Sequence, residues 1–296
     1  MRKRITFGNK RVAYALLVPQ FTIIFVFFYW PAVQSVYQAF TLSDPWGQSV
    51  KFVWFDNIVQ LFRSPEYYDS IFVTFVFSIC TSAIAMSLGL LFAVYADRVI
   101  RGQTAYRSLL IWPYAVAPVI AGALWLFLFH PAYGAVAFTL ERGLGLKWDP
   151  LLNGVHGMTL VVVATAWKQI SYNFVFFMAG LQAIPRSLVE AAAIDGAGPF
   201  KRFLTIVLPL LSPITFFLLV MNIVFVFFDT FGIIEGITEG GPGDATNILV
   251  YKIYTDGFLG LDLGSSAAQS VVLMFMVIAL TVVQFRYIER KVHYAG

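Results

Sequence analysis

Six long, uninterrupted apolar stretches limit what this chain can fold into. Each is about as long as the roughly 20 residues that a helix needs to cross the hydrocarbon core of a bilayer. The stretches cover residues 12–33, 71–95, 108–129, 158–181, 210–231 and 266–285. Because a helix satisfies its own backbone polar groups where no water is present, the pattern predicts an all-α membrane protein with six transmembrane helices.

The composition agrees with a membrane protein and excludes several other classes. Hydrophobic residues make up 59% of the chain and charged residues only 12%, against about 25% charged residues in soluble domains. The single cysteine, Cys80, lies inside an apolar stretch, and the three histidines, His130, His156 and His293, are scattered. We therefore expect no catalytic residue, no bound metal and no nucleic-acid partner; the net charge of +4 is spread between the apolar segments.

The distribution of lysine and arginine predicts the orientation. Fourteen of these residues fall before the first apolar stretch, after the last one, and in the loops 97–107 and 182–209, whereas the other three loops hold five. The positive-inside rule then places both termini in the cytoplasm. We divide the chain into a cytoplasmic tail (1–11), a six-span transmembrane domain (12–286) and a second cytoplasmic tail (287–296). Within the domain we distinguish a cytoplasmic loop (184–209) and an outward loop (232–265).

The cytoplasmic loop 184–209 carries the most informative pattern. Prolines are placed to open helices and glycines to end them, which predicts two short helices joined by a tight turn. Leu188, Ala191, Ala192 and Asp195 share one helical face, and the alanines keep that face slim enough to enter a groove on another protein. A helix that lies on lipid headgroups, favoured by the two basic residues at 201–202, is the alternative.

The same loop resembles a known family. Glu190-Ala-Ala, Gly196, Ile206 and Leu208-Pro209 have the spacing of the EAA signature of binding-protein-dependent ABC importer permeases. The resemblance implies a type I importer fold in which the segment 186–198 is a coupling helix held in a cleft of a cytoplasmic ATPase. The coupling residues so implied are Arg186, Glu190, Ala191, Ala192, Asp195 and Gly196. The sequence contains no phosphate-binding Gly-x-x-x-x-Gly-Lys-Ser/Thr loop, so we expect no cofactor on this chain and expect ATP and magnesium on the partner ATPase.

Further segments narrow the resemblance. The Gly240-Gly241-Pro242 loop resembles that of carbohydrate-type permeases, and the runs 167–174, 184–198 and 261–273 resemble the A-type permease subunits of sn-glycerol-3-phosphate importers. This implies uptake of sn-glycerol-3-phosphate or glycerophosphodiesters across a bacterial inner membrane. The implied partners are a second homologous permease, an ATPase dimer and a periplasmic or lipid-anchored solute-binding protein. Import of another sugar or oligosaccharide is the main alternative; an ion-coupled secondary transporter is less favoured because the halves show no internal repeat.

Polar residues inside the apolar stretches mark a candidate substrate path. Lys168 lies in the middle of the fourth stretch, where an unpaired charge costs several kcal/mol, and Tyr172 and Asn173 follow it. The candidates in the fifth and sixth stretches are Asn222, Asp229 and Gln269. We expect the last three spans to line the path, with Lys168 as counter-charge to a phosphorylated solute. The alternatives for Lys168 are pairing with Asp229 or a neighbouring subunit, or a misplaced span. For the others they are hydrogen bonds between packed helices and, for Asp229, solvation near the outer end of its span.

Overall fold

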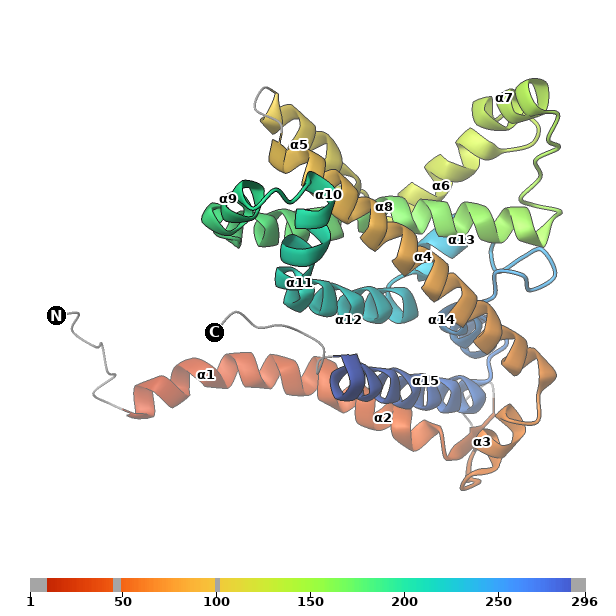
Figure 1. Cartoon of the computed structure of the whole chain (residues 1–296). Coiled ribbons are helices and arrows are strands. Elements are labelled where there is room, and N and C mark those ends of the chain that lie inside the picture. Colours follow the sequence, from red (N-terminus) through yellow and green to blue (C-terminus); the bar gives the residue numbers. More distant parts are fainter. Residues whose placement is uncertain (1–9, 45–48, 99–101, 289–296) are drawn as a thin grey trace. The chain divides into compact units, whose positions relative to one another are not determined.

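The structure is a computed structural model that describes residues 10–44, 49–98 and 102–288, and it is predominantly helical (Figure 1). Most of both predicted tails, 1–9 and 289–296, lies outside the described residues. The longer helices are α1 (Lys10–Ile24), α2 (Trp30–Gln38), α4 (Pro65–Arg98), α5 (Gln103–Ile111), α6 (Pro118–Phe129), α7 (Ala135–Leu144), α8 (Gly154–Ala183), α9 (Arg186–Ile194), α12 (Ser212–Phe228) and α15 (Leu263–Val283). Shorter ones are α3 (Asp56–Leu61), α10 (Pro199–Arg202), α11 (Leu208–Leu210), α13 (Phe231–Ile237) and α14 (Leu249–Tyr254).

Short helical turns of other types join several of these helices. They are η1 (Phe25–Tyr29), η2 (Trp112–Ala115), η3 (Phe203–Val207), η4 (Thr255–Leu259) and η5 (Gln284–Ile288). The sequence did not predict the antiparallel hairpin of β1 (Thr41–Ser43) and β2 (Val50–Phe52), in which Leu42 pairs with Lys51.

Four of the predicted spans are continuous apolar helices long enough to cross a membrane. They cover Tyr14–Gln38, Pro65–Asp97, Gly154–Ala183 and Leu263–Tyr287. The other two fall on bent helix pairs, Thr104–Ala115 with Pro118–Phe129 at 104° and Pro199–Leu210 with Ser212–Phe228 at 66°. The all-α membrane fold is therefore confirmed, and the count reaches six when each bent pair is one span. The cytoplasmic placement of the termini stays a prediction.

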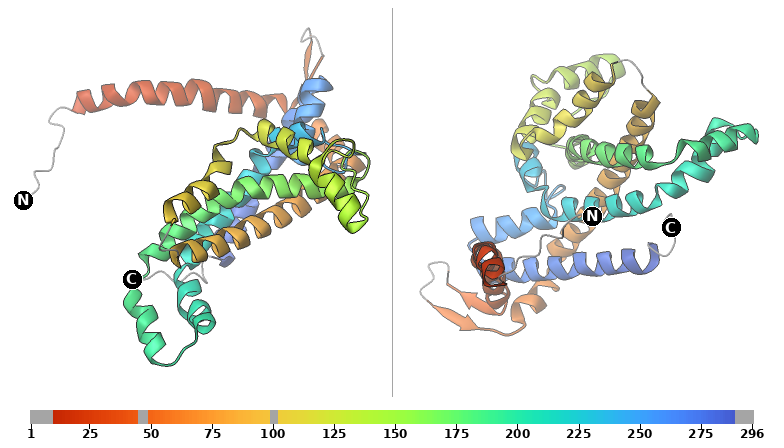
Figure 2. Two further views of the ribbon diagram at one scale, coloured as in Figure 1. Left: turned by 90° about the horizontal axis from the view of Figure 1, so that it is seen from above. Right: turned by 90° about the vertical axis from the view of Figure 1, so that its left-hand side faces the viewer.

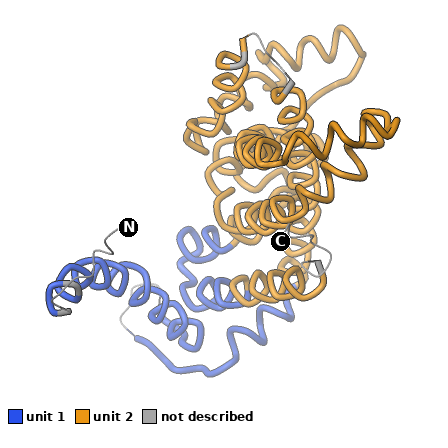
Figure 3. Tube along the Cα trace, turned by 60° about the vertical axis from the view of Figure 1, so that its left-hand side comes forward, with its two compact units in different colours: residues 1–64, 253–272 blue, residues 65–252, 273–296 orange. Residues whose placement is uncertain are grey.

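The chain divides into two compact units, residues 65–252 with 273–296 and residues 1–64 with 253–272 (Figure 3). The core of the larger unit is built around α4 and α8. Ala85, Gly89 and Ala93 recur every four residues on α4 and are buried. A Cβ atom on Gly89 would lie 2.6 Å from the Cβ of Asn173 on α8. Small residues at this spacing let two membrane helices approach closely.

The helix α13 of the larger unit folds mostly from the segment predicted as the outward loop (232–265). α13 carries a Gly-x-x-x-Gly pattern at Gly232 and Gly236, and α6 contributes Gly122. A Cβ on Gly236 would lie 2.7 Å from the carbonyl oxygen of Val119, so the two backbones are in direct contact. Ile233 and Ile234 are fully buried, which makes α13 part of the core.

The smaller unit packs α3 and the β hairpin with the first turns of α15. Ala39, Ala267, Ala268 and Val271 form its buried apolar cluster. The Asn57 side chain donates hydrogen bonds to the carbonyl oxygens of Ala39 and Thr41, at 3.0 and 2.9 Å. This amide holds the strand end in place.

Candidate functional site

Lys168 lies near the middle of α8 and is only 5% exposed. Its ammonium donates hydrogen bonds to backbone carbonyls at the bend between η2 and α6: Pro113 at 3.4 Å, Tyr114 at 3.5 Å, and Val116. Within the described chain, the Lys168 ammonium bonds to no carboxylate, and so it forms no ion pair with Asp229. The structure thus gives the lysine a partner that neither sequence interpretation included, the backbone of a broken span.

A cavity of about 540 Å³ opens beside this lysine. Lys168, Gln169 and Tyr172 line it from α8, residues 114–118 line it from the bend, and Met221, Val224, Phe225 and Asp229 line it from the α12 side. Three of the predicted path residues therefore share one cavity: Lys168, Tyr172 and Asp229. The Tyr114 and Tyr172 rings stack with centroids 6.2 Å apart, which joins the bend to α8 a second time.

The other three predicted path residues lie elsewhere. Asn173 and Asn222 are fully buried and bond to each other, so α8 and α12 are joined by an amide pair. Gln269 belongs to the smaller unit, where it is 1% exposed and donates to the Asp256 carboxylate at 2.6 Å. Their contact with solute remains a prediction, and these hydrogen bonds match the packing alternative.

The coupling segment forms α9, a helix without a single buried residue. Figure 2 shows α9 and α10 as a hairpin that projects from the helices of the larger unit. α9 starts after Pro185 and ends at Ile194; Asp195 caps it and Gly196 follows with a φ of +81°. The Gly196 N–H bonds to the Ala193 oxygen and the Ala197 N–H to the Ala192 oxygen, which together form the Schellman motif that glycine permits.

The exposed face of α9 differs in part from the predicted one. Leu188, Ala191 and Asp195 are exposed as expected, whereas Ala192 is half-buried. The most exposed large apolar side chain of α9 is Ile194, at 87% exposure. Ile194 was not among the residues predicted for this face, although its position between Ala191 and the C-terminal glycine was a usable signal.

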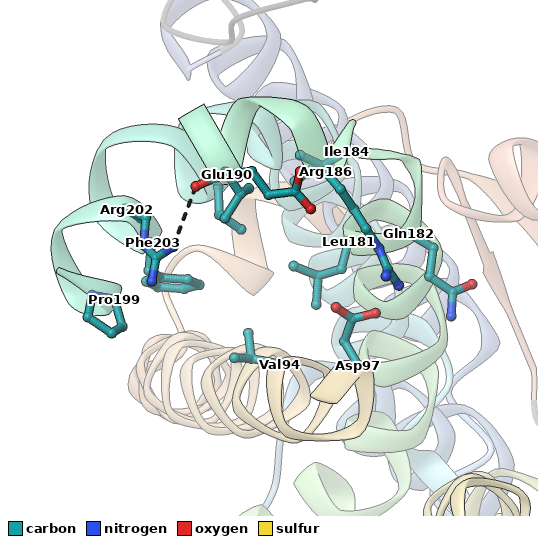
Figure 4. A pocket seen from close by; sticks show the side chains of 12 residues that line it. Val94, Asp97, Leu181, Gln182, Ile184, Arg186, Glu190, Pro199, Arg202 and Phe203 are labelled. Carbon is teal, nitrogen blue, oxygen red and sulfur yellow. Dashed lines mark hydrogen bonds between the residues drawn. The ribbon is translucent and has the colours of Figure 1, made fainter. Parts of the chain in front are cut away.

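A second cavity, of about 650 Å³, lies under α9. Arg186 and Glu190 line it from α9, and Asp97 lines it from the end of α4. In Figure 4 the Arg186 and Asp97 side chains point toward one another, and Arg202 donates to the Val189 oxygen at 3.5 Å. Gly196 stands outside this cavity. Of the predicted coupling residues, Arg186 and Glu190 thus line the cavity, whereas Ala191, Asp195 and Gly196 are exposed outside it.

The described residues (10–44, 49–98 and 102–288) hold no cluster of three or more His, Cys, Asp or Glu side chains that could bind a metal ion. The polar side chains around the first cavity comprise one buried cation, one amide, two tyrosines and an exposed carboxylate. This set can hold a small polar solute by charge and hydrogen bonds.

Comparisons with known proteins match nearly the whole chain. Residues 14–294 fit the family described as "Binding-protein-dependent transport system inner membrane component". The chain is 59% identical over 292 residues to the sn-glycerol-3-phosphate transport system permease protein UgpA of Rhizobium meliloti (strain 1021), and the match covers 99% of each protein. UgpA of Brucella abortus biovar 1 (strain 9-941) is 59% identical over 293 residues, covering 99% of this chain and 100% of that protein.

The fold also resembles solved structures. One is a chain in the crystal structure of a bacterial ABC transporter involved in the import of the acidic polysaccharide alginate, with a TM-score of 0.82 and 21% identity over 94% of this chain and 95% of that chain. Another is from that transporter in complex with an alginate pentasaccharide-bound periplasmic protein, with a TM-score of 0.81 and 20% identity over 97% and 98%. At these identities the likeness extends to the fold alone.

Proposed function

Since this chain belongs to the family of binding-protein-dependent transport system inner membrane components, we propose that it is the permease subunit of an ATP-driven importer for sn-glycerol-3-phosphate. The proposed substrate rests on the 59% identity, over almost the full length, to permease proteins of sn-glycerol-3-phosphate transport systems. The chain is a multi-pass inner-membrane protein, and its relatives are transport permeases rather than enzymes. Glycerophosphodiesters, which share the glycerol phosphate group, are included in the proposed substrate class.

The work is divided among several subunits in this proposal. A solute-binding protein delivers the solute from outside, as the family name implies. A second homologous permease completes the translocation path, and an ATPase dimer binds ATP and magnesium on the cytoplasmic side. This chain then contributes half of the path and one docking helix, and it binds no cofactor.

The projecting helix α9 is the proposed coupling element. Its exposed side chains from Leu188 to Asp195 would lie in a cleft of the ATPase, and its Schellman end would hold its length fixed. Because α9 follows α8 after only Ile184 and Pro185, a push on α9 acts directly on the helix that carries Lys168. ATP-driven closure of the ATPases would thereby open the cavity to one side of the membrane and then to the other.

Transport into proteoliposomes tests the proposal. The chain is reconstituted with its partner permease, its ATPase and its binding protein, and uptake of labelled sn-glycerol-3-phosphate is followed with and without ATP. We expect ATP-dependent uptake that competes with glycerophosphodiesters and not with neutral sugars. Preference for a neutral sugar would instead support the carbohydrate alternative, and uptake driven by an ion gradient without the ATPase would support a secondary transporter.

A further inference from the structure

The bend in the third span leaves the Tyr114 carbonyl without its helical partner, whereas the Pro113 oxygen accepts the Val116 N–H at 3.3 Å. η2 ends at Ala115, and Val116 and Ala117 are extended, with ψ values of 130° and 139°. In a continuous helix the Tyr114 carbonyl would accept the N–H of the residue four positions later, but that residue is Pro118, which has none. The break therefore presents a carbonyl oxygen that needs another donor within the membrane.

Lys168 supplies that donor, but the carbonyls leave its charge uncompensated. Pro113, Tyr114 and Val116 offer neutral oxygen atoms, and no carboxylate bonds to this ammonium in the described part of the chain. A cation that is 5% exposed within a span costs free energy unless an anion accompanies it. The site thus satisfies the hydrogen bonds of the ammonium while keeping its affinity for a negative charge.

The cavity beside Lys168 has room for the missing anion. Its volume of about 540 Å³ lies within the range of about 300–1,000 Å³ that is usual for small-ligand sites. Tyr172 lies one helical turn from Lys168, and both line the cavity, as does Gln169. The one carboxylate in the lining, Asp229, is exposed, so the buried part of the wall is positive.

We propose that Lys168 is the phosphate-binding residue of this permease and that it exchanges its backbone carbonyl partners for the phosphate oxygens of the solute. A phosphate is charged and a carbonyl is not, so the solute forms the stronger, charge-assisted hydrogen bonds. The exchange breaks the hydrogen bonds between Lys168 and the bend at residues 113–116, which links occupation of the cavity to the conformation of the third span. This inference rests on the proposed function, because it specifies how that solute is held.

Variants of Lys168 in the assembled importer test the exchange. The chain with its partner permease, ATPase and binding protein is placed in proteoliposomes, and the sn-glycerol-3-phosphate imported per ATP hydrolysed is measured per assembled complex. Lys168→Gln keeps a hydrogen-bond donor for the carbonyls but removes the charge, so we expect this ratio to fall about tenfold or more. Lys168→Arg keeps the charge and is expected to retain more import than Lys168→Gln.

Lys147→Gln is the matched control, because Lys147 is exposed in the loop before α8 and does not line the cavity. Its ratio should stay within about twofold of the parent. An unchanged ratio in Lys168→Gln would overturn the exchange. A loss confined to the amount of assembled complex would overturn it too, because Lys168 would then serve only to bond the backbone carbonyls of the bend. A parent importer that moves neutral sugar and not sn-glycerol-3-phosphate would overturn the proposed function itself.

Inorganic phosphate tests whether Lys168 binds the phosphate group whatever molecule carries it. Added inside the vesicles, it should lower the import ratio of the parent and leave the residual import of Lys168→Gln unaffected. Equal inhibition of both would place its site away from Lys168 and contradict the assignment.

Discussion

The side-chain amides of Asn173 and Asn222 each donate a hydrogen bond to the oxygen of the other, at 3.1 and 2.8 Å. Each amide also donates to a carbonyl on its own helix, to Gln169 and Leu218 respectively. Both residues are fully buried. The pair joins α8, which carries Lys168, to α12, which borders the same cavity, so it fixes the distance between two walls of the candidate path.

This reciprocal bonding predicts a non-additive effect on stability. Asn173→Leu or Asn222→Leu alone leaves a buried amide without its partner, so each should lower the free energy of unfolding by about 1–2 kcal/mol. The double variant removes both polar groups and should lose less than the sum of the two. Thermal unfolding of the four proteins in detergent measures this, and strictly additive losses would contradict the pairing.

The contact between α6 and α13 predicts that Gly236 tolerates no side chain. The added methyl group of Gly236→Ala would meet the Val119 carbonyl oxygen at 2.7 Å, and overpacking of this kind typically costs about 1–3 kcal/mol. Gly143→Ala on α7 is the control, because no atom lies within 4 Å of the added carbon and alanine favours the helix. We expect the melting temperature to fall for Gly236→Ala and to hold or rise for Gly143→Ala. Equal effects would show that α6 and α13 are not in backbone contact.

The exposure of Ile194 predicts a role in holding the ATPase. A side chain 87% exposed at the end of a projecting helix is available to a partner, and a charge placed in that interface would be desolvated. Ile194→Asp should therefore weaken co-purification of the ATPase by about tenfold or more in apparent affinity. Leu152→Asp is matched in exposure, at 83%, and lies in the loop before α8. The prediction is wrong if both variants retain the ATPase equally.

The sequence predicted the helical membrane fold because apolar length is a local property of the chain. The stretch 108–129 also reads as one uninterrupted run, yet the structure bends it by 104° between η2 and α6. Pro113 and Pro118 were visible signals of that bend. Hydrophobicity alone could not show it, because both halves of a broken span are apolar. In the segment 232–265 the error was the opposite, because its many polar residues predicted a loop where the structure has the buried helix α13. The spacing of Gly232 and Gly236 was a usable signal for that helix.

The candidate site was only partly accessible from the sequence. A lysine in the middle of an apolar stretch is unusual enough to be noticed, and so is the signature around Glu190. The partners of Lys168 are backbone carbonyls more than fifty residues away in the chain, and no residue type marks them. The bond between Asn173 and Asn222 depends in the same way on how α8 and α12 pack.

Solute uptake and ATP hydrolysis by Gly196→Pro, measured together in the reconstituted importer, test the coupling by α9 most directly. Proline fixes φ near −65° and removes the N–H that Gly196 donates to Ala193, so it cannot form the end of α9. Gly198→Ala, two residues on, keeps a φ of −64° and meets no neighbouring atom, and it should behave as the parent. We predict that the Gly196→Pro chain inserts into the membrane but loses both uptake and solute-stimulated ATP hydrolysis. Uptake that stays coupled to ATP in this variant would contradict the account.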